Sequence, residues 1–185
     1  MPPKVKVTKE EMVDCAVSLV RSSGVGALNA RALATALGCS TQPIFSNFSG
    51  MEALKLAVAD RAVALFNEFT QKEIASGKYP PYKATGMAYV RFAKEEKELF
   101  KLLYMENSAA IQARNQASWD LAVEAIEKNM GYSRKDAELM HAEMWVVVHG
   151  LATMLATEYM DWNFETASLI ITDVFQGIKT RFPKE

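Results

Sequence analysis

Four side chains in a short stretch near the N-terminus of this 185-residue chain have the chemistry of nucleic-acid contact. They are Thr41, Gln42, Ser46 and Asn47. Their hydroxyl and amide groups can hydrogen-bond base edges or phosphates, and a glutamine can pair with two edge atoms of adenine at once. Ile44 and Phe48 stand among them at positions i and i+4, the spacing of one face of a helix. The pattern predicts a short helix with an apolar inner side and a polar, amide-rich outer side.

A second short helix is predicted just before this one. Its apolar positions follow the i, i+3, i+4, i+7 rule and are Ala30, Leu33, Ala34 and Leu37. Gly38 is expected to end it, because glycine accepts the left-handed conformation found after a helix C-terminus. Ser40 is the expected N-cap of the helix that follows. Two short helices joined by a glycine-containing turn make a helix-turn-helix, whose second helix enters the major groove of DNA.

The predicted DNA contacts divide into base readers and backbone contacts. Thr41 and Gln42 are the expected base readers, because the first turn of the second helix meets the bases and a threonine methyl can touch a thymine methyl. Backbone contacts are expected from Arg31, Ser46, Asn47 and Ser49. The full predicted set is Arg31, Ser40, Thr41, Gln42, Phe45, Ser46, Asn47 and Ser49. An N-terminal arm along the DNA could be formed by Lys4, Lys6 and Lys9.

Helix signals continue along the whole chain, without the alternation typical of strands. Capping residues are expected at Thr8 (with Glu11), Asn29, Ser49 (with Glu52) and Ser133. The helix that begins after Ser49 should run to about Ala75, and Gly77–Pro81 then breaks the chain. Later helices are expected over Tyr82–Lys94, Lys97–Tyr104, Ser108–Asn129, Ser133–Tyr159 and Phe164–Phe182. The expected fold is all-α with about nine helices: a helix-turn-helix domain over residues 1–52 and a ligand-binding and dimerisation domain over residues 53–185.

Composition limits the class of protein. The net charge is −1, which excludes a polycation that coats nucleic acid, although residues 1–50 hold five basic and three acidic side chains. Cys15 and Cys39 are expected to be small buried thiols in a reducing compartment, with a redox pair as the alternative. No signal peptide is apparent, and the longest uncharged apolar run, Met144–Thr157, is too short to cross a bilayer. A soluble, cytoplasmic protein without a membrane partner is expected.

The second domain is rich in aromatic and methionine side chains, the lining of many small-molecule pockets. The predicted ligand contacts are Phe100, Tyr104, Trp119, Met144, Trp145 and His149. Trp145 and His149 are i, i+4 neighbours on one helix face, and His149 could present a hydrogen-bond donor. Gly150 suggests the close approach of a helix or a ligand. The hypothesis is a small apolar or aromatic effector; the alternative is an ordinary packed core.

A homodimer is expected from the last two long helices. Met144–Ala156 is apolar almost all round, which places that helix either at the centre of the molecule or at a subunit interface. Helix-turn-helix proteins usually bind two half-sites about 34 Å apart and so need two copies of the reader. We expect the two helices to pair with their copies in a four-helix interface, and an ordinary monomeric core is the alternative.

These stretches together resemble the TetR-like transcriptional regulators. The resemblance covers residues 8–55 and is carried by Ala32–Ser40, Ile44–Phe48 and Met51–Leu54. In the second half, Trp145–Gly150 is similar to the W-x-x-x-H-G signature of one group of TetR-like C-terminal domains. The resemblance implies a dimer that binds a palindromic operator on double-stranded DNA, in most cases as a repressor, and is released by a small effector. We expect no cofactor and no catalytic residue.

Three positions depart from that pattern. The family often has Tyr where this chain has Phe45, His where it has Asn47, and Lys near Met51. The tyrosine commonly contacts a phosphate, and phosphate contacts supply much of the affinity for DNA. A helical adaptor that has lost DNA binding is therefore one alternative function.

An enzyme is the other alternative. Glu138 and His141 form a Glu-x-x-His unit of the kind found in helical di-iron sites. Such sites need a second unit and two further glutamates, and the sequence has no second unit. No P-loop, G-x-G-x-x-G or Ser-His-Asp order is found either. We therefore expect neither a metal nor catalysis.

Overall fold

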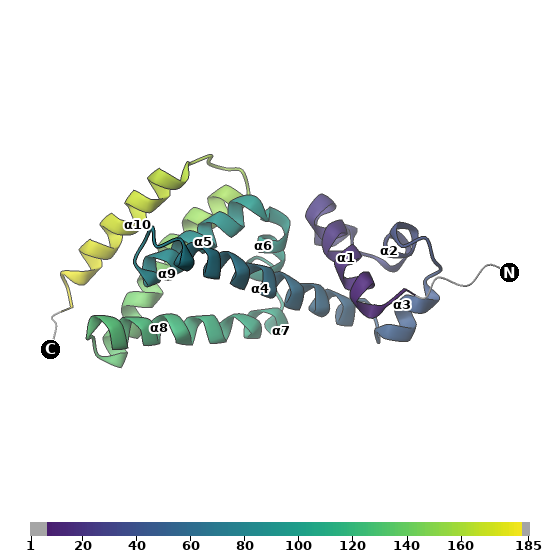
Figure 1. Ribbon diagram of the computed structural model, residues 1–185, viewed down its shortest axis with the longest axis horizontal. Coiled ribbons are helices and arrows are strands. Elements are labelled where there is room, and N and C mark those ends of the chain that lie inside the picture. The colour runs from purple at the N-terminus through teal and green to yellow at the C-terminus, as the bar shows by residue number, and fades with distance from the viewer. Residues whose placement is uncertain (1–6, 183–185) are drawn as a thin grey trace.

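The computed structural model describes residues 7–182, and within this range every regular element is a helix (Figure 1). The all-α prediction is confirmed. The elements are α1 (Lys9–Ser23), η1 (Val25–Ala27), α2 (Ala30–Ala36), α3 (Gln42–Asn47), α4 (Met51–Ala75), α5 (Pro81–Glu95), α6 (Lys97–Tyr104), α7 (Ala109–Gln112), η2 (Ala113–Asn115), α8 (Gln116–Met130), α9 (Arg134–Ala156) and α10 (Phe164–Lys179). Lys4 and Lys6 of the predicted arm lie outside the described residues.

Helices α1, α2 and α3 form a head at one end of an elongated molecule, and α4 runs from the head into the helical body (Figure 1). Buried apolar side chains hold the head together, among them Met12, Val20, Leu33, Ile44 and Phe48, and they belong to the same core as the body. These side chains are less than a tenth exposed, so the two short helices are held by burial rather than by their own propensity.

Two of the predicted caps in the head are confirmed. The Thr8 hydroxyl accepts from the Glu11 amide at 3.1 Å, and the Glu11 carboxylate accepts from the Thr8 amide at 2.7 Å. Asn29 Oδ1 accepts from the amides of Arg31 and Ala32. Gly38 ends the preceding helix as predicted, with φ at +64°.

The other two predicted caps in this region are wrong. The N-cap of α3 is Thr41 rather than Ser40, and its side chain makes no capping bond. A cap side chain accepts from the second or third helical amide, but Pro43 has no amide hydrogen and the Ile44 amide already donates to the Thr41 carbonyl. The N-cap of α4 is Gly50, so Ser49 stands one residue too early to cap it.

In the body, α4 packs against α5, and α5 in turn packs against α9. By length and composition α9 would qualify as a membrane span, but it packs against α5, α6, α8 and α10, as the central helix of a bundle does. Ser133 caps it as predicted, through a bond from the Asp136 amide. It ends at Ala156 rather than Tyr159, and α10 ends at Lys179 rather than Phe182.

The single helix predicted over 108–129 is wrong. The structure divides it into α7, the 3-10 turn η2 and α8. The sequence between residues 109 and 130 has neither glycine nor proline, so it carries no local signal for a break. Arg114 lies in η2 and bonds both the Ala110 carbonyl and Asp60 on α4. The break therefore coincides with a contact to a distant helix, which periodicity does not encode.

Candidate nucleic-acid interface and candidate ligand site

All eight residues predicted to contact DNA lie at the surface of the head. Gln42, Phe45, Ser46 and Asn47 are exposed on α3, while Ile44 and Phe48 are buried behind them. Arg31, Ser40 and Ser49 are exposed as well, and Thr41 is half-buried. The fold thus gives α3 one apolar side packed on the head and one side turned to solvent.

The polar groups on this surface differ in whether they are free to bind. Ser46 Oγ donates to the Gln42 carbonyl at 2.9 Å, and Asn47 Nδ2 donates to the Pro43 carbonyl at 2.8 Å. The Gln42 amide and the Ser40 and Thr41 hydroxyls have no side-chain hydrogen bond to any residue in the range 7–182. Gln42 therefore has the most available hydrogen-bonding group on α3.

Few cations accompany these groups. Arg31 is exposed on the first turn of α2, and its guanidinium forms no ion pair within residues 7–182. Lys9 lies over the Phe48 ring, with its ammonium nitrogen 5.1 Å from the ring centre. Arg21 bonds Glu96 at the end of α5. Arg31 and Lys9 are thus the head's described cations without a carboxylate partner.

Five of the six predicted ligand contacts come together in the body as one connected group of rings. Trp145 and His149 stack in parallel, with centres 4.7 Å apart and planes 9° from parallel. The His149 ring lies 6.0 Å from Phe100, which is 5.1 Å from Tyr104. Trp119 lies 6.3 Å from Trp145 and so joins α8 to the group. Met144 is buried on α9. We call the five residues with rings, Phe100, Tyr104, Trp119, Trp145 and His149, the ring cluster.

Sequence reasoning missed three further members, Tyr82, Tyr89 and His141. Tyr82 Oη lies 2.9 Å from His141 Nδ1, and Tyr89 Oη lies 2.9 Å from His149 Nδ1. The tyrosines are seven residues apart on α5 and the histidines eight apart on α9, so the two helices run in the same direction. This shared two-turn spacing is the signal that could have paired them.

Burial keeps the ring cluster and its neighbours uncharged. It lowers the pKa of His141 to about 4 and lowers the pKa of His149 as well. Burial also raises the pKa values of Tyr82, Tyr89 and Tyr104 far above the usual phenol value. At neutral pH each imidazole therefore has one donor and one acceptor nitrogen, of which Nδ1 is already bonded.

One buried polar atom near this group has no partner. Thr153 Oγ1 is shielded from solvent and makes no hydrogen bond within the described chain. Thr153 stands one helical turn beyond His149, which in turn follows Trp145 by one turn. A buried hydroxyl left unpaired costs about 1–3 kcal/mol, so a ligand that bonded it would recover stability.

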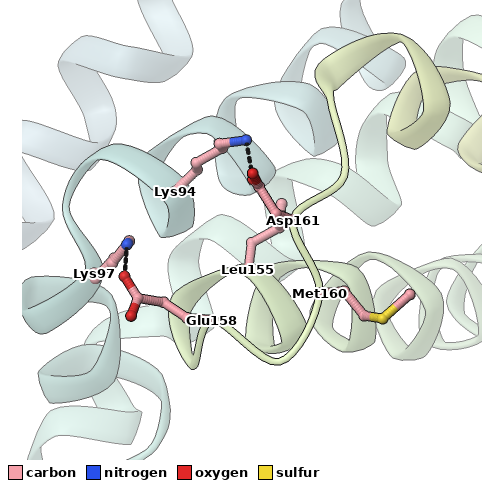
Figure 2. A pocket seen from close by; sticks show the side chains of 6 residues that line it. All are labelled: Lys94, Lys97, Leu155, Glu158, Met160 and Asp161. Carbon is pink, nitrogen blue, oxygen red and sulfur yellow. Dashed lines mark hydrogen bonds and ion pairs between the residues drawn. The ribbon is translucent and has the colours of Figure 1, made fainter.

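A cavity of about 260 Å³ lies outside the ring cluster, where the α5–α6 corner meets the chain after α9 (Figure 2). Figure 2 shows Lys94 reaching Asp161 and Lys97 reaching Glu158 across it. The Lys94–Asp161 distance is 2.8 Å. The lysines and carboxylates that line the cavity pair with one another. These ion pairs connect two segments of the chain, so the charges are not free to bind a ligand.

The residues of the candidate metal unit have other partners. The Glu138 carboxylate accepts from Arg134 Nε at 2.9 Å, and His141 is bonded to Tyr82. Within residues 7–182 no group of three or more histidine, cysteine or acidic side chains is placed to hold a metal ion. Cys15 and Cys39 are both half-buried free thiols, and burial raises the pKa of Cys15.

We compared the chain with protein families, with curated proteins and with solved structures. Residues 82–172 match the family model described as the tetracyclin repressor-like, C-terminal domain. No curated protein matches the chain. A solved protein of unknown function from Rhodococcus sp. RHA1 has 21% sequence identity and a TM-score of 0.74, covering 98% of each chain.

Two further solved structures share the fold. A TetR-like transcriptional regulator from the same organism has 17% identity and a TM-score of 0.70, covering 95% of this chain and 96% of its own. MexZ, a repressor responsible for antibiotic resistance in Pseudomonas aeruginosa, has 19% identity and a TM-score of 0.62, covering 90% and 92%.

Proposed function

Because this chain is a TetR-like protein, in its fold and in the family that its residues 82–172 match, we propose that it is a cytoplasmic DNA-binding transcriptional regulator. It acts as a homodimeric repressor on a palindromic operator and is released by a small apolar or aromatic effector. Residues 1–52 read DNA, and residues 53–185 bind the effector and dimerise.

The observation that carries this proposal is the two-sided character of α3. Its inner side is anchored by Ile44 and Phe48, and its outer side offers an unbonded glutamine amide to solvent. Such a face contributes nothing to the core of the head. It fits the major groove, where a glutamine can read adenine by two hydrogen bonds.

Dimerisation is proposed through α9 and α10. Val146 on α9 and Leu169 on α10 are each 64% exposed, and Leu139 is exposed two turns before Val146. Apolar side chains exposed on two neighbouring helices are typical of a surface that a second copy covers. The four helices of such a dimer bury these side chains.

The effector site is proposed at the ring cluster. Trp145 is 40% exposed and stacked on His149, so an apolar molecule can reach the cluster from the surface by displacing the indole. The unpaired hydroxyl of Thr153 and the remaining nitrogen of His149 supply polar contacts. Binding releases DNA only if the effector prefers the conformation that does not fit the operator.

The direct test is a mobility-shift assay of the full chain with DNA from upstream of its own gene. We expect a shift that weakens steeply with salt, because phosphate contacts release counterions. Gln42→Ala should reduce the preference for that DNA over unrelated DNA. Gln176→Ala, which removes an exposed glutamine from α10, is the matched control and should bind as the unmodified chain does.

The absence of any shift at low salt would contradict the proposal and favour the adaptor. Phe45 and the small number of free cations on the described part of the head support that second candidate. For the effector, tryptophan fluorescence and thermal shifts should change on addition of an apolar aromatic compound. A Trp145→Phe variant that reports identical changes would place the site elsewhere.

A further inference from the structure

The exposed phenyl ring of Phe45 is an unexpected feature of α3. Its side chain is 54% exposed, although an apolar ring gains nothing from solvent. It stands three residues after Gln42, which places it about 60° around the helix from that glutamine and one turn along. Gln42 and Phe45 therefore form neighbouring parts of one surface, with an amide beside a phenyl ring.

The phenyl ring cannot serve the DNA backbone in the way a hydroxyl or an ammonium does. It has neither a donor for a phosphate oxygen nor a charge. The Ser46 hydroxyl already donates its hydrogen to the Gln42 carbonyl, and Asn47 Nδ2 donates to the Pro43 carbonyl. Gln42 is therefore the residue of α3 whose side-chain amide is wholly unbonded, and Phe45 beside it offers apolar surface.

The major groove offers one apolar group that distinguishes bases, the 5-methyl group of thymine. Three residues of helix advance about 4.5 Å, and successive bases along a strand are about 3.4 Å apart. A base pair next to the one that Gln42 contacts is thus within reach of the ring. Adenine satisfies the amide through two hydrogen bonds, and a thymine methyl covers the ring.

We propose that Phe45 is a base-contacting residue that packs on a thymine methyl, beside an adenine read by Gln42. The ligand is duplex DNA in which each of the two half-sites contains two adjacent A·T pairs. The adenine of one pair contacts Gln42, and the thymine of the other contacts Phe45. The inference rests on the proposed DNA binding and deepens it. It assigns sequence reading to a position where a phenol would contact phosphate.

The experiment selects preferred sites from random duplex DNA with the full chain and then replaces each selected thymine with deoxyuridine, which lacks only the methyl group. Affinity is measured by fluorescence anisotropy at one fixed salt concentration. At one thymine per half-site we expect the replacement to weaken binding about fourfold, as for the loss of one buried methyl group. The other thymines should tolerate it.

The variants separate the ring from the amide. Phe45→Ala should bind both DNAs equally, because it no longer has a ring for the methyl group to contact. Gln42→Ala should keep its sensitivity to the missing methyl but lose discrimination at the neighbouring adenine. Both side chains are exposed, and thermal melts monitored by circular dichroism should show that the variants remain folded.

Three results would overturn the inference. Selected sites with only G·C pairs opposite α3, or deoxyuridine replacements without effect on the unmodified chain, would leave the regulator standing but remove this role of Phe45. Equal sensitivity of Phe45→Ala would do the same. If the chain bound no DNA at low salt, the proposed function would fail and this inference with it.

Discussion

Arg21 and Glu96 join the head to the body by two hydrogen bonds, from Nε to Oε2 at 2.7 Å and from Nη2 to Oε1 at 2.6 Å. Arg21 is on α1, and Glu96 follows the last residue of α5. The two-pronged geometry suits a planar guanidinium, and the bonds to Glu96 raise the pKa of Arg21. The orientation of α1 relative to α5 is thereby tied to a charged pair.

Glu96 lies at the corner between α5 and α6, and this corner contacts both the head and the chain that follows α9. Its lysines, Lys94 and Lys97, pair with Asp161 and Glu158 after α9, as Figure 2 shows. Two glutamates of the corner contact the head instead. Glu96 bonds Arg21, and Glu98 lies next to Gly24. This corner therefore contacts both the chain after α9 and the head.

The first prediction concerns this pair. A double-mutant cycle with Arg21→Ala and Glu96→Ala should give a coupling energy of about 1 kcal/mol in urea unfolding, the upper part of the range for partly exposed pairs. Arg21 is partly exposed, so solvent screens the charge interaction. A coupling energy indistinguishable from zero would mean that the pair does not tie the head to the body.

A second prediction concerns Gly24, which has φ at +75°. A Cβ atom placed there would lie 2.8 Å from Glu98 Oε2. Gly24→Ala should therefore destabilise the protein by about 1–2 kcal/mol, from backbone strain and the close contact. Gly26→Ala is the matched control, because its Cβ meets open space. Equal unfolding midpoints for the two variants would refute the strain argument.

A third prediction concerns acid stability. Burial lowers the pKa of His141 from the ordinary imidazole value of 6.5 to about 4. As the pH falls, His141 therefore takes up a proton in the unfolded chain before it does so in the folded protein. The stability that comes from the neutral His141 is fully present above about pH 6.5 and is lost between pH 6.5 and 4. The loss should be on the order of 2 kcal/mol in the free energy of unfolding.

The variant that checks this assignment is His141→Gln, which retains hydrogen-bonding groups but does not titrate. Urea unfolding of both proteins at several pH values should show a flatter pH dependence for the variant between pH 6.5 and 4. Carboxylates titrate in the same range, so the informative quantity is the difference between the two curves. Parallel curves would assign the acid sensitivity to other groups.

A fourth prediction concerns the salt dependence of DNA binding. Arg31 lacks an ion-pair partner within the described chain, so its charge is available to a phosphate. Arg31→Ala should weaken binding to all sequences alike and reduce the slope of log K against log salt by about one per protomer. Lys135→Ala on α9 is the control, and an unchanged slope for Arg31→Ala would rule out that contact.

A fifth prediction concerns the dimer. Val146→Glu should give a monomer in light scattering at concentrations where the unmodified chain is a dimer, because a carboxylate would be buried without a partner. Leu121→Glu changes an equally exposed apolar residue on α8, outside the proposed interface, and should remain dimeric. A dimeric Val146→Glu variant would place the interface elsewhere.

The head illustrates what local patterns predict well. The capping box at Thr8, the glycine that follows the end of α2 and the two-sided pattern of α3 were all predictable, because each depends on residues within about one helical turn. The Ser40 cap failed for a local reason too. A cap at Ser40 would bond the amide of residue 43, and this residue is a proline without an amide hydrogen, as the sequence already shows.

The amino-acid sequence alone determined the helical class, most helix boundaries and the inner and outer sides of α3, since hydrophobic periodicity and capping act over a few residues. Only the tertiary structure decided that Tyr82 and Tyr89 bond the two histidines, that Arg114 lies at a break in a helix, and that Arg21 meets Glu96. These contacts join residues 54 to 75 positions apart. Such pairs form only when whole helices pack together, and the direction of that packing is set by the summed burial of many side chains rather than by any local pattern.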